Sequence, residues 1–132
     1  MRISTTEFVA IMAMLVATVA ISIDGMLPAL TIIADELTPL RPNKSQLILS
    51  SFVAGMAVGT LVVGPLSDSY GRKPIIYYGA SLYIFTSAVC ILSQSLEVIL
   101  IARFLQGAGA SAPRVVAQAL VRDFYQGREM AR

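Results

Sequence analysis

Three charged residues interrupt long apolar stretches of the sequence, where charge is costly. Asp24 lies in the first apolar run (8–34), and Arg103 and Arg114 lie in the last one. An arginine at the centre of a membrane costs about 2.5–3.5 kcal/mol on insertion scales, so charges in such places mark candidate functional sites. An acid and a base of this kind can pair, and the acid can carry a proton.

Asp24 and Arg103 are expected to lie at a similar depth in a membrane. A helix that enters the apolar core near Phe8 reaches Asp24 after about 24 Å, and Arg103 lies roughly 8 Å below the outer surface. Pro28 should kink the first helix at Asp24, because its ring clashes with that carbonyl and it has no N–H to donate. Arg103 would then be a partner for the freed group. The pair is either a static link between helices or a proton-carrying site.

The last apolar run is expected to form a helix with one polar face. Arg114 follows Arg103 by 11 positions, so their directions differ by only about 20°. Gln106, Gly107 and Ala110 fall on the same side, while the opposite side is lipid-like. Arg114 lies much deeper than Arg103, towards the cytoplasm. The candidate cavity residues are therefore Asp24, Arg103, Gln106 and Arg114.

Composition excludes several classes of function. Of 132 residues, 56% are hydrophobic and 14% are charged, which leaves too little polar surface for a soluble domain. The net charge of +2 and the lack of a basic cluster argue against nucleic acid as a partner. His is absent and Cys90 is the single cysteine. No metal cluster, phosphate loop or nucleophile–base pair is recognisable, so we expect no enzyme, no metal and no cofactor.

The periodic arrangement of apolar runs predicts an all-α integral membrane protein with about four transmembrane helices. They are expected near 8–34, 45–66, 74–96 and 98–121, each long enough for a hydrocarbon core of ~30 Å. A cleaved signal peptide over 1–20 is the alternative for the first run, but that run continues past any cleavage point. The turn at 93–97 is so short that the last two helices should be antiparallel neighbours.

Small residues in the second run predict close packing of helices. Gly55 and Gly59 follow Ser51 at four-residue spacing and form a stripe that permits close contact in lipid. Pro65 is expected to end this helix.

The distribution of Lys and Arg between the loops predicts the orientation. One side holds Arg2, Arg72, Lys73, Arg122, Arg128 and Arg132. The other side holds only Arg41 and Lys44. Because cytoplasmic loops carry the excess of positive charge, the N-terminus and the loop 64–74 should be cytoplasmic.

The loop 64–74 combines turn residues with charges that are typical of a conformational switch. Gly64 and Gly71 permit sharp turns or close approach of backbones, and Asp68 precedes Arg72 and Lys73. An ordinary charged turn is the simpler interpretation. The order of residues resembles the Gly-x-Leu-x-Asp-x-x-Gly-Arg-Lys signature of the major facilitator superfamily. That resemblance implies that Asp68 and Arg72 lock one transport state.

Two further segments resemble the drug:proton antiporters of the Bcr/CflA type within this superfamily. The segment Ile23-Asp24-Gly25-Met26-Leu27-Pro28-Ala29-Leu30 is similar to their first-helix signature, and Arg103-Phe104-Leu105-Gln106-Gly107 begins a motif similar to that of their fourth helix. The resemblance implies that Asp24 and Arg103 belong to the proton-coupling and drug-binding region. Ser69 departs from the pattern, where a basic residue is common, and so do Pro113 and Arg114, where small residues are usual.

The resemblance implies the N-terminal part of a bacterial inner-membrane efflux antiporter. Such transporters have twelve helices, so this chain would supply about four of the six in the first bundle and would need the missing C-terminal helices as partners. An amphipathic drug-like molecule and a proton would be its substrates, within a lipid bilayer. An uptake transporter of the same superfamily and a non-transporting four-helix membrane protein are the alternatives. Continuation of the reading frame past Arg132 would separate the last of these from the others.

Overall fold

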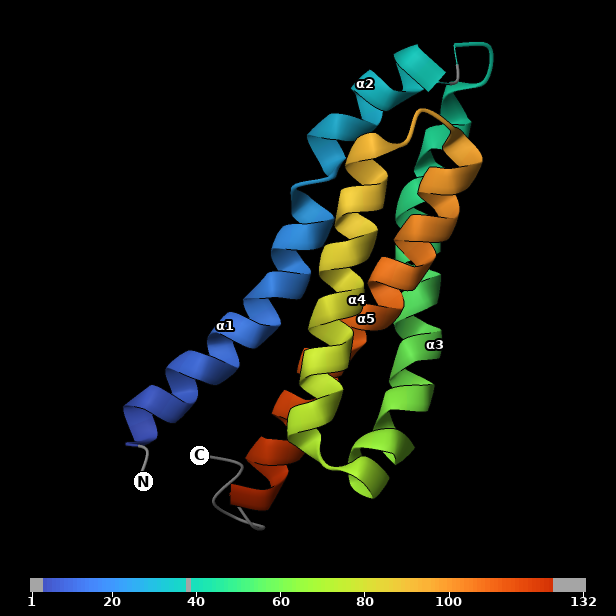
Figure 1. The fold of residues 1–132 in the computed structure, drawn as a ribbon. Helices are drawn as coiled ribbons and strands as arrows, with labels where there is room; N and C mark the ends of the chain where they lie inside the picture. Colours follow the sequence, from blue (N-terminus) through green and yellow to red (C-terminus); the bar gives the residue numbers. More distant parts are fainter. Residues whose placement is uncertain (1–3, 38, 125–132) are drawn as a thin grey trace.

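The computed structural model describes residues 4–37 and 39–124 as a bundle of helices (Figure 1). No strand occurs among these residues. The elements in chain order are α1 (Thr5–Asp24), α2 (Leu27–Leu37), the 3-10 helix η1 (Pro42–Ser45), α3 (Gln46–Tyr70), α4 (Arg72–Leu92) and α5 (Leu96–Phe124).

The first apolar run forms two helices, so the prediction of a single helix over 8–34 is wrong. α1 begins earlier, where Ser4 and Glu7 form a reciprocal capping box, and it ends at Asp24. α2 begins at Leu27 and ends at Leu37. The break lies where Pro28 has no N–H to donate to the carbonyl of Asp24. The predicted kink is therefore a full interruption of the helix.

The junction between α3 and α4 is much shorter than the predicted loop over 64–74. α3 continues through Pro65 and ends at Tyr70, so Pro65 does not end the helix. Only Gly71 separates the two helices, and its φ of 91° is a conformation that favours glycine. The hydroxyl of Ser69 donates to the carbonyl of Pro65 at 3.0 Å. Gly64 has open space where a Cβ would lie, so neither a turn nor a close contact requires glycine there.

The boundaries of α4 and α5 also differ from the predicted ones. α4 begins at Arg72 and ends at Leu92 rather than near residue 96. After Ser93–Ser95 the chain reverses into α5, which extends to Phe124. The two helices pack side by side as expected from the short turn.

α5 is the central helix of the bundle, and glycines let its neighbours approach it closely. α3 and α4 both pack extensively on α5, whereas α1 makes fewer contacts with it. A Cβ at Gly55 would lie 1.8 Å from the carbonyl oxygen of Phe104, and one at Gly107 would lie 2.0 Å from that of Phe52. A Cβ at Gly59 would lie 2.7 Å from the Cα of Ala108. The small-residue stripe of α3 is thus covered by α5 of the same chain.

On the α4 side the same kind of contact recurs between two glycines. A Cβ added at Gly79 or at Gly109 would lie 2.8 Å from the carbonyl oxygen of the other residue. Helices without a hydrophobic driving force between them associate through such close packing in lipid. Gly79 was not recognised from the sequence, because α4 shows no regular stripe of small residues.

The outside of the bundle is apolar, as expected for a chain surrounded by lipid. Large hydrophobic side chains such as Leu61, Ile84 and Ile91 are more than two-thirds exposed. Three segments among the described residues are long and apolar enough to cross a membrane: Thr6–Leu37, Asn43–Tyr70 and Arg72–Leu92. α5 is not one of them, because Arg103, Gln106 and Arg114 lower its hydropathy. Its length matches the others, and it packs among them.

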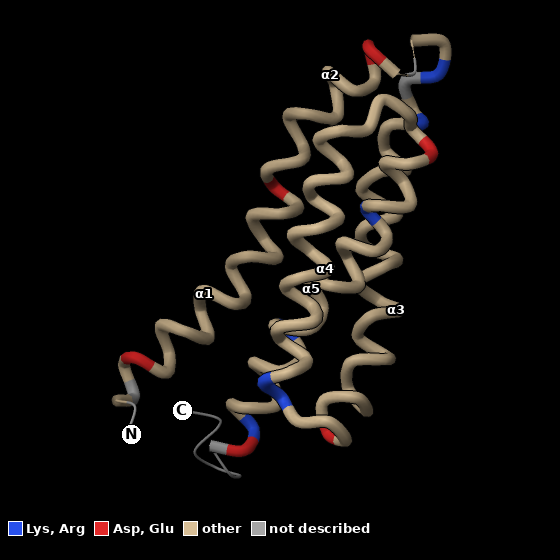
Figure 2. The backbone as a smooth tube through the Cα atoms, viewed as in Figure 1, with Lys and Arg blue, Asp and Glu red and all other residues tan. Residues whose placement is uncertain are grey.

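Both ends of the described chain lie at one end of the bundle, together with the α3–α4 junction (Figure 1). The connection from α2 to α3 and the turn from α4 to α5 lie at the opposite end. Charged residues gather at these two ends, with few in between (Figure 2). This arrangement fits helices that cross an apolar layer.

Candidate functional site

Arg103 extends from α5 to the break between α1 and α2, but it does not bind Asp24 there. Its Nη2 donates to the sulfur of Met26, and its Nε is buried without a hydrogen-bond partner. A thioether sulfur is a weak acceptor, so the guanidinium group is poorly satisfied. Among the described residues Asp24 forms no ion pair, and the predicted pairing with Arg103 is wrong in this structure.

Asp24 is the last residue of α1, and its side chain is exposed. The interruption of the helix explains why the predicted pairing fails. Gly25 and Met26 form a tight turn, in which the Met26 N–H donates to the carbonyl of Ile23 at 3.1 Å. This turn brings Met26, which is only 8% exposed, to the position facing Arg103.

Gln106 is the most buried polar residue of the predicted face, with 4% of its surface exposed. Its Nε2 donates to the hydroxyl of Ser87 on α4 at 2.6 Å, while its Oε1 is buried without a partner. Ser87 was missed by sequence reasoning, because it is a single hydroxyl in an apolar run without a recognisable pattern. Gln106 therefore faces α4, whereas Gly107 packs on α3.

Arg114 is exposed and lies about one turn beyond the centre of α5. Its Nη1 lies 3.8 Å from the sulfur of Met56 on α3, a contact at the outer limit for a sulfur acceptor. Arg103 and Arg114 thus share one feature, since each contacts a methionine sulfur of a neighbouring segment. Neither forms an ion pair with a described residue.

The charges of the predicted switch region pair differently from the expectation. Arg72 forms an ion pair with Asp123 at the end of α5, and no ion pair with Asp68. Asp68 is exposed and lines a cleft of about 320 Å³ between α3 and α5, opposite Gln118 and Arg122. Lys73 is exposed. The α3–α4 junction is therefore tied to the end of α5 through Arg72.

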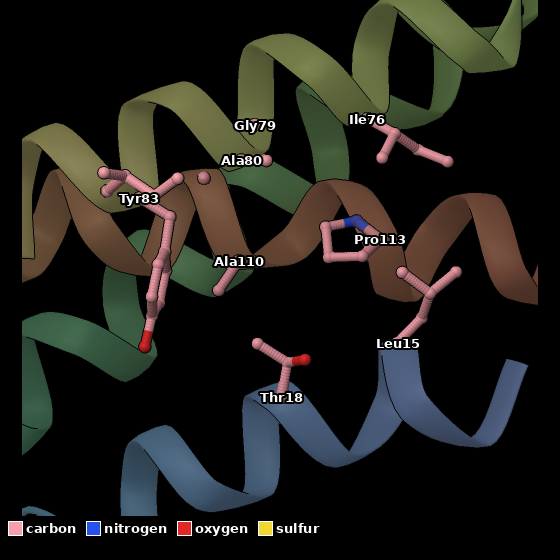
Figure 3. Close-up of a pocket in the computed structure, with 10 residues that line it drawn as sticks. Leu15, Thr18, Ile76, Gly79, Ala80, Tyr83, Ala110 and Pro113 are labelled. Atoms are coloured by element: carbon pink, nitrogen blue, oxygen red, sulfur yellow. The ribbon is translucent and has the colours of Figure 1, made fainter. Parts of the chain in front are cut away.

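An apolar cavity of about 240 Å³ lies between α1, α4 and α5 (Figure 3). Thr18 and Tyr83 supply the hydroxyl groups near it. Both hydroxyls are already bonded within the chain, that of Thr18 to the Met14 carbonyl at 3.0 Å and that of Tyr83 to Ser22 at 2.5 Å. The cavity can therefore take hydrocarbon, and its two hydroxyls have no free proton to donate to a ligand.

Metal binding has no visible basis in the described part of the chain. No three His, Cys, Asp or Glu side chains come close enough together there to hold an ion.

Comparison with known proteins relates the chain to membrane transporters. The sequence model of the Major Facilitator Superfamily matches residues 9–132. The chain is 38% identical over 112 residues to the uncharacterized MFS-type transporter YdgK of Bacillus subtilis, covering 85% of this chain and 28% of that protein. It is 41% identical over 95 residues to the multidrug resistance protein MdtL of Escherichia coli O157:H7, covering 70% and 24%.

A third relative is a chloramphenicol resistance protein of Pseudomonas aeruginosa, 38% identical over 110 residues, with 83% of this chain and 26% of that protein covered. The chain spans about a quarter of the length of these curated relatives. No solved structure matches it significantly. The helical fold, its apolar exterior and the match over nearly the whole sequence agree, and this multi-pass membrane protein belongs to the major facilitator superfamily of transporters rather than to an enzyme family.

Proposed function

We propose that the chain forms the first helices of a proton-coupled multidrug efflux antiporter of a bacterial inner membrane, with its N-terminus in the cytoplasm. The observation that carries this proposal is the sequence identity to proteins named for multidrug and chloramphenicol resistance, 41% over 95 residues and 38% over 110 residues. Alternating access would move an amphipathic drug-like molecule outwards while a proton moves inwards. The remaining helices of such a transporter would complete the bundle.

Asp24 is the proposed proton carrier. It lies at the end of α1, before α2 and away from both ends of the first membrane segment, and it is exposed at an interruption of the helix instead of being fixed in an ion pair. A carboxylate that is held by no cation is free to exchange a proton as its access to water changes. This geometry favours the proton-carrying role over the static link between helices.

The region around Gly64, Asp68, Gly71, Arg72 and Lys73 is the proposed conformational switch. Arg72 holds the end of α5 through Asp123, and Asp68 faces the cleft that Arg122 also lines. Exchange of these partners when the cleft opens or closes would couple the α3–α4 junction to α5. A switch of this kind requires two discrete arrangements of such contacts, and the exchange of partners would provide them.

The test of proton coupling is drug-induced proton release from the purified transporter in detergent. Asp24→Asn mimics the protonated carboxyl and nearly keeps its shape, so it should bind a neutral drug but release no proton. Asp35→Asn, at an exposed carboxylate of α2, is the matched control and should release protons like the wild type. Proton release by Asp24→Asn equal to that of the wild type would show that another group is the coupling acid.

A further inference from the structure

Two arginines of α5 occupy the apolar layer without a carboxylate partner. Ala110 is the midpoint of α5, so Arg103 lies about 10 Å to one side of it and Arg114 about 6 Å to the other. Both positions fall within an apolar layer of ~30 Å. Neither guanidinium group forms an ion pair with a described residue. The layer therefore contains two positive charges that this part of the chain does not neutralise.

The donors of both guanidinium groups are largely unused. The Nε of Arg103 is buried without a partner, and its Nη2 reaches only the Met26 sulfur. Arg114 is exposed, and its Nη1 is 3.8 Å from the Met56 sulfur. A guanidinium group presents five donors in a planar fork that matches a carboxylate or a similar oxyanion. Thioether sulfurs satisfy almost none of this capacity.

Carboxylates of the described chain are too few and too remote to supply the missing charge. Asp24 is the acidic residue of the apolar layer, and it is exposed and unpaired. The others lie near the ends of the helices, namely Glu7, Asp35, Glu36, Asp68, Glu97 and Asp123. Even with Asp24 ionised, the layer retains an excess positive charge.

We propose that Arg103 and Arg114 select substrates that carry an anionic group, a carboxylate or a sulfonate, on an apolar body. The two guanidinium groups are about 16 Å apart along α5, so a small anion would bind one and then the other rather than both at once. Met26 and Met56 place flexible, polarizable side chains beside them, which suits apolar bodies of different shape. This inference rests on the proposed function for the direction of transport, and it adds the charge of the substrate.

Two fluorescent probes with the same apolar skeleton test the charge preference directly. Anilinonaphthalene sulfonate carries the anionic group, and N-phenyl-naphthylamine lacks it. Each is titrated into purified protein in nanodiscs of zwitterionic lipid, with empty nanodiscs as the blank. The wild type should bind the sulfonate at least about tenfold more tightly, because a charge-assisted hydrogen bond contributes that much. Equal affinities for the two probes would overturn the proposal.

Variants of the arginines assign the preference to these residues. Arg114→Gln should reduce the preference without affecting folding, because Arg114 is exposed and Arg103 remains. Arg114→Lys keeps the charge and should retain part of the preference. Arg41→Gln removes an exposed cation outside the apolar layer and should change nothing. Retention of the full preference by both Arg114→Gln and Arg103→Gln would contradict the assignment.

The outcome is independent of proton coupling. A neutral drug that releases protons, from a protein without preference for the sulfonate, would refute the charge selection and leave the proposed antiport intact. A preference for the sulfonate in a protein that releases no protons would refute the proposed proton coupling and support the charge selection.

Discussion

Arg72 is the residue whose partner differs most clearly from expectation. The signature order suggested Asp68, four residues before it, whereas the structure pairs it with Asp123 on α5. Asp68 lies in the last turn of α3, and Gly71 reverses the direction of the chain before Arg72. The two side chains therefore belong to different helices, and closeness in sequence did not bring them together.

A double-mutant cycle on Arg72 measures which partner it has. The Arg72→Gln and Asp123→Asn cycle should give a coupling of about 0.2–1 kcal/mol in the free energy of unfolding, as partly exposed ion pairs do. The Arg72→Gln and Asp68→Asn cycle should give none. The measurement is unfolding in sodium dodecyl sulfate followed by circular dichroism. A larger coupling to Asp68 than to Asp123 would restore the pairing suggested by the signature.

Asp68 itself is expected to act on transport more than on stability. It is exposed at the cleft that Arg122 lines, so Asp68→Asn removes a charge that the folded state does not need. The proposed switch gives Asp68 a charged partner in the other transport state, and loss of that one contact would shift the equilibrium between the states by a factor of about 10 to 150. Efflux in cells should fall while the amount of protein in the membrane stays near normal. Unchanged efflux would mean that the junction is only a connection.

The side of a helix on which a residue lies was predictable from the sequence, because helical geometry alone determines it. The spacing of Arg103 and Arg114 indicated one side of a helix. Each side chain contacts a methionine sulfur of a neighbouring segment. Their partners were not predictable, because they depend on where α1 is interrupted. A turn of two residues decides whether Asp24 or Met26 faces Arg103.

At the scale of helices, α3, α4 and α5 are held together by backbone contacts at glycines. The spacing of Gly55 and Gly59 predicts close packing, and the structure shows that α5 is the helix that packs against them. Helix boundaries were less predictable. Pro65 lies inside α3 because neighbouring hydroxyls and helices can satisfy the backbone groups that a proline frees in a membrane helix.

Two glycine-to-alanine substitutions on α3 distinguish the effect of the α3–α5 contact on stability from the effect of helix propensity. Gly55→Ala should destabilise the fold by about 1–3 kcal/mol or more, because the new Cβ would lie 1.8 Å from the Phe104 carbonyl oxygen and force α3 from α5. Gly64→Ala meets no atom within 4 Å and should be neutral or stabilise by up to about 1 kcal/mol. Unfolding in sodium dodecyl sulfate measures both. Similar values for the two variants would mean that α3 does not approach α5 as described.

For the whole molecule, the fold class was predictable because apolar runs of sufficient length have few alternatives in a membrane protein. Hydropathy alone does not identify the fourth run as a membrane span. α5 is too polar to be recognised as a membrane span from its length and hydropathy, yet it is the helix on which α3 and α4 pack. Its polar residues are tolerated because its neighbours, rather than lipid, surround much of its surface, as the burial of Gln106 and Ser111 shows.

The orientation of the molecule in its membrane follows from charge. The end of the bundle with the α3–α4 junction carries Arg72, Lys73 and Arg122, and the opposite end carries Arg41 and Lys44. Because positively charged loops stay in the cytoplasm, the junction should face inwards and the α2–α3 connection outwards. Single cysteines at Asn43 and Ser69 test this, since both residues are exposed, Asn43 in η1 just before α3 and Ser69 near the end of α3.

The background for the labelling is Cys90→Ala, which removes the native thiol of α4. An impermeant maleimide added to intact cells should label the Asn43→Cys variant and leave Ser69→Cys unlabelled until the membrane is permeabilised. Equal labelling of both after permeabilisation is the control for reactivity. Preferential labelling of Ser69→Cys in intact cells would reverse the orientation. Asp24 would then lie in the half of the membrane nearer the cytoplasm, and the proposed route of the proton from outside to Asp24 would have to be redrawn.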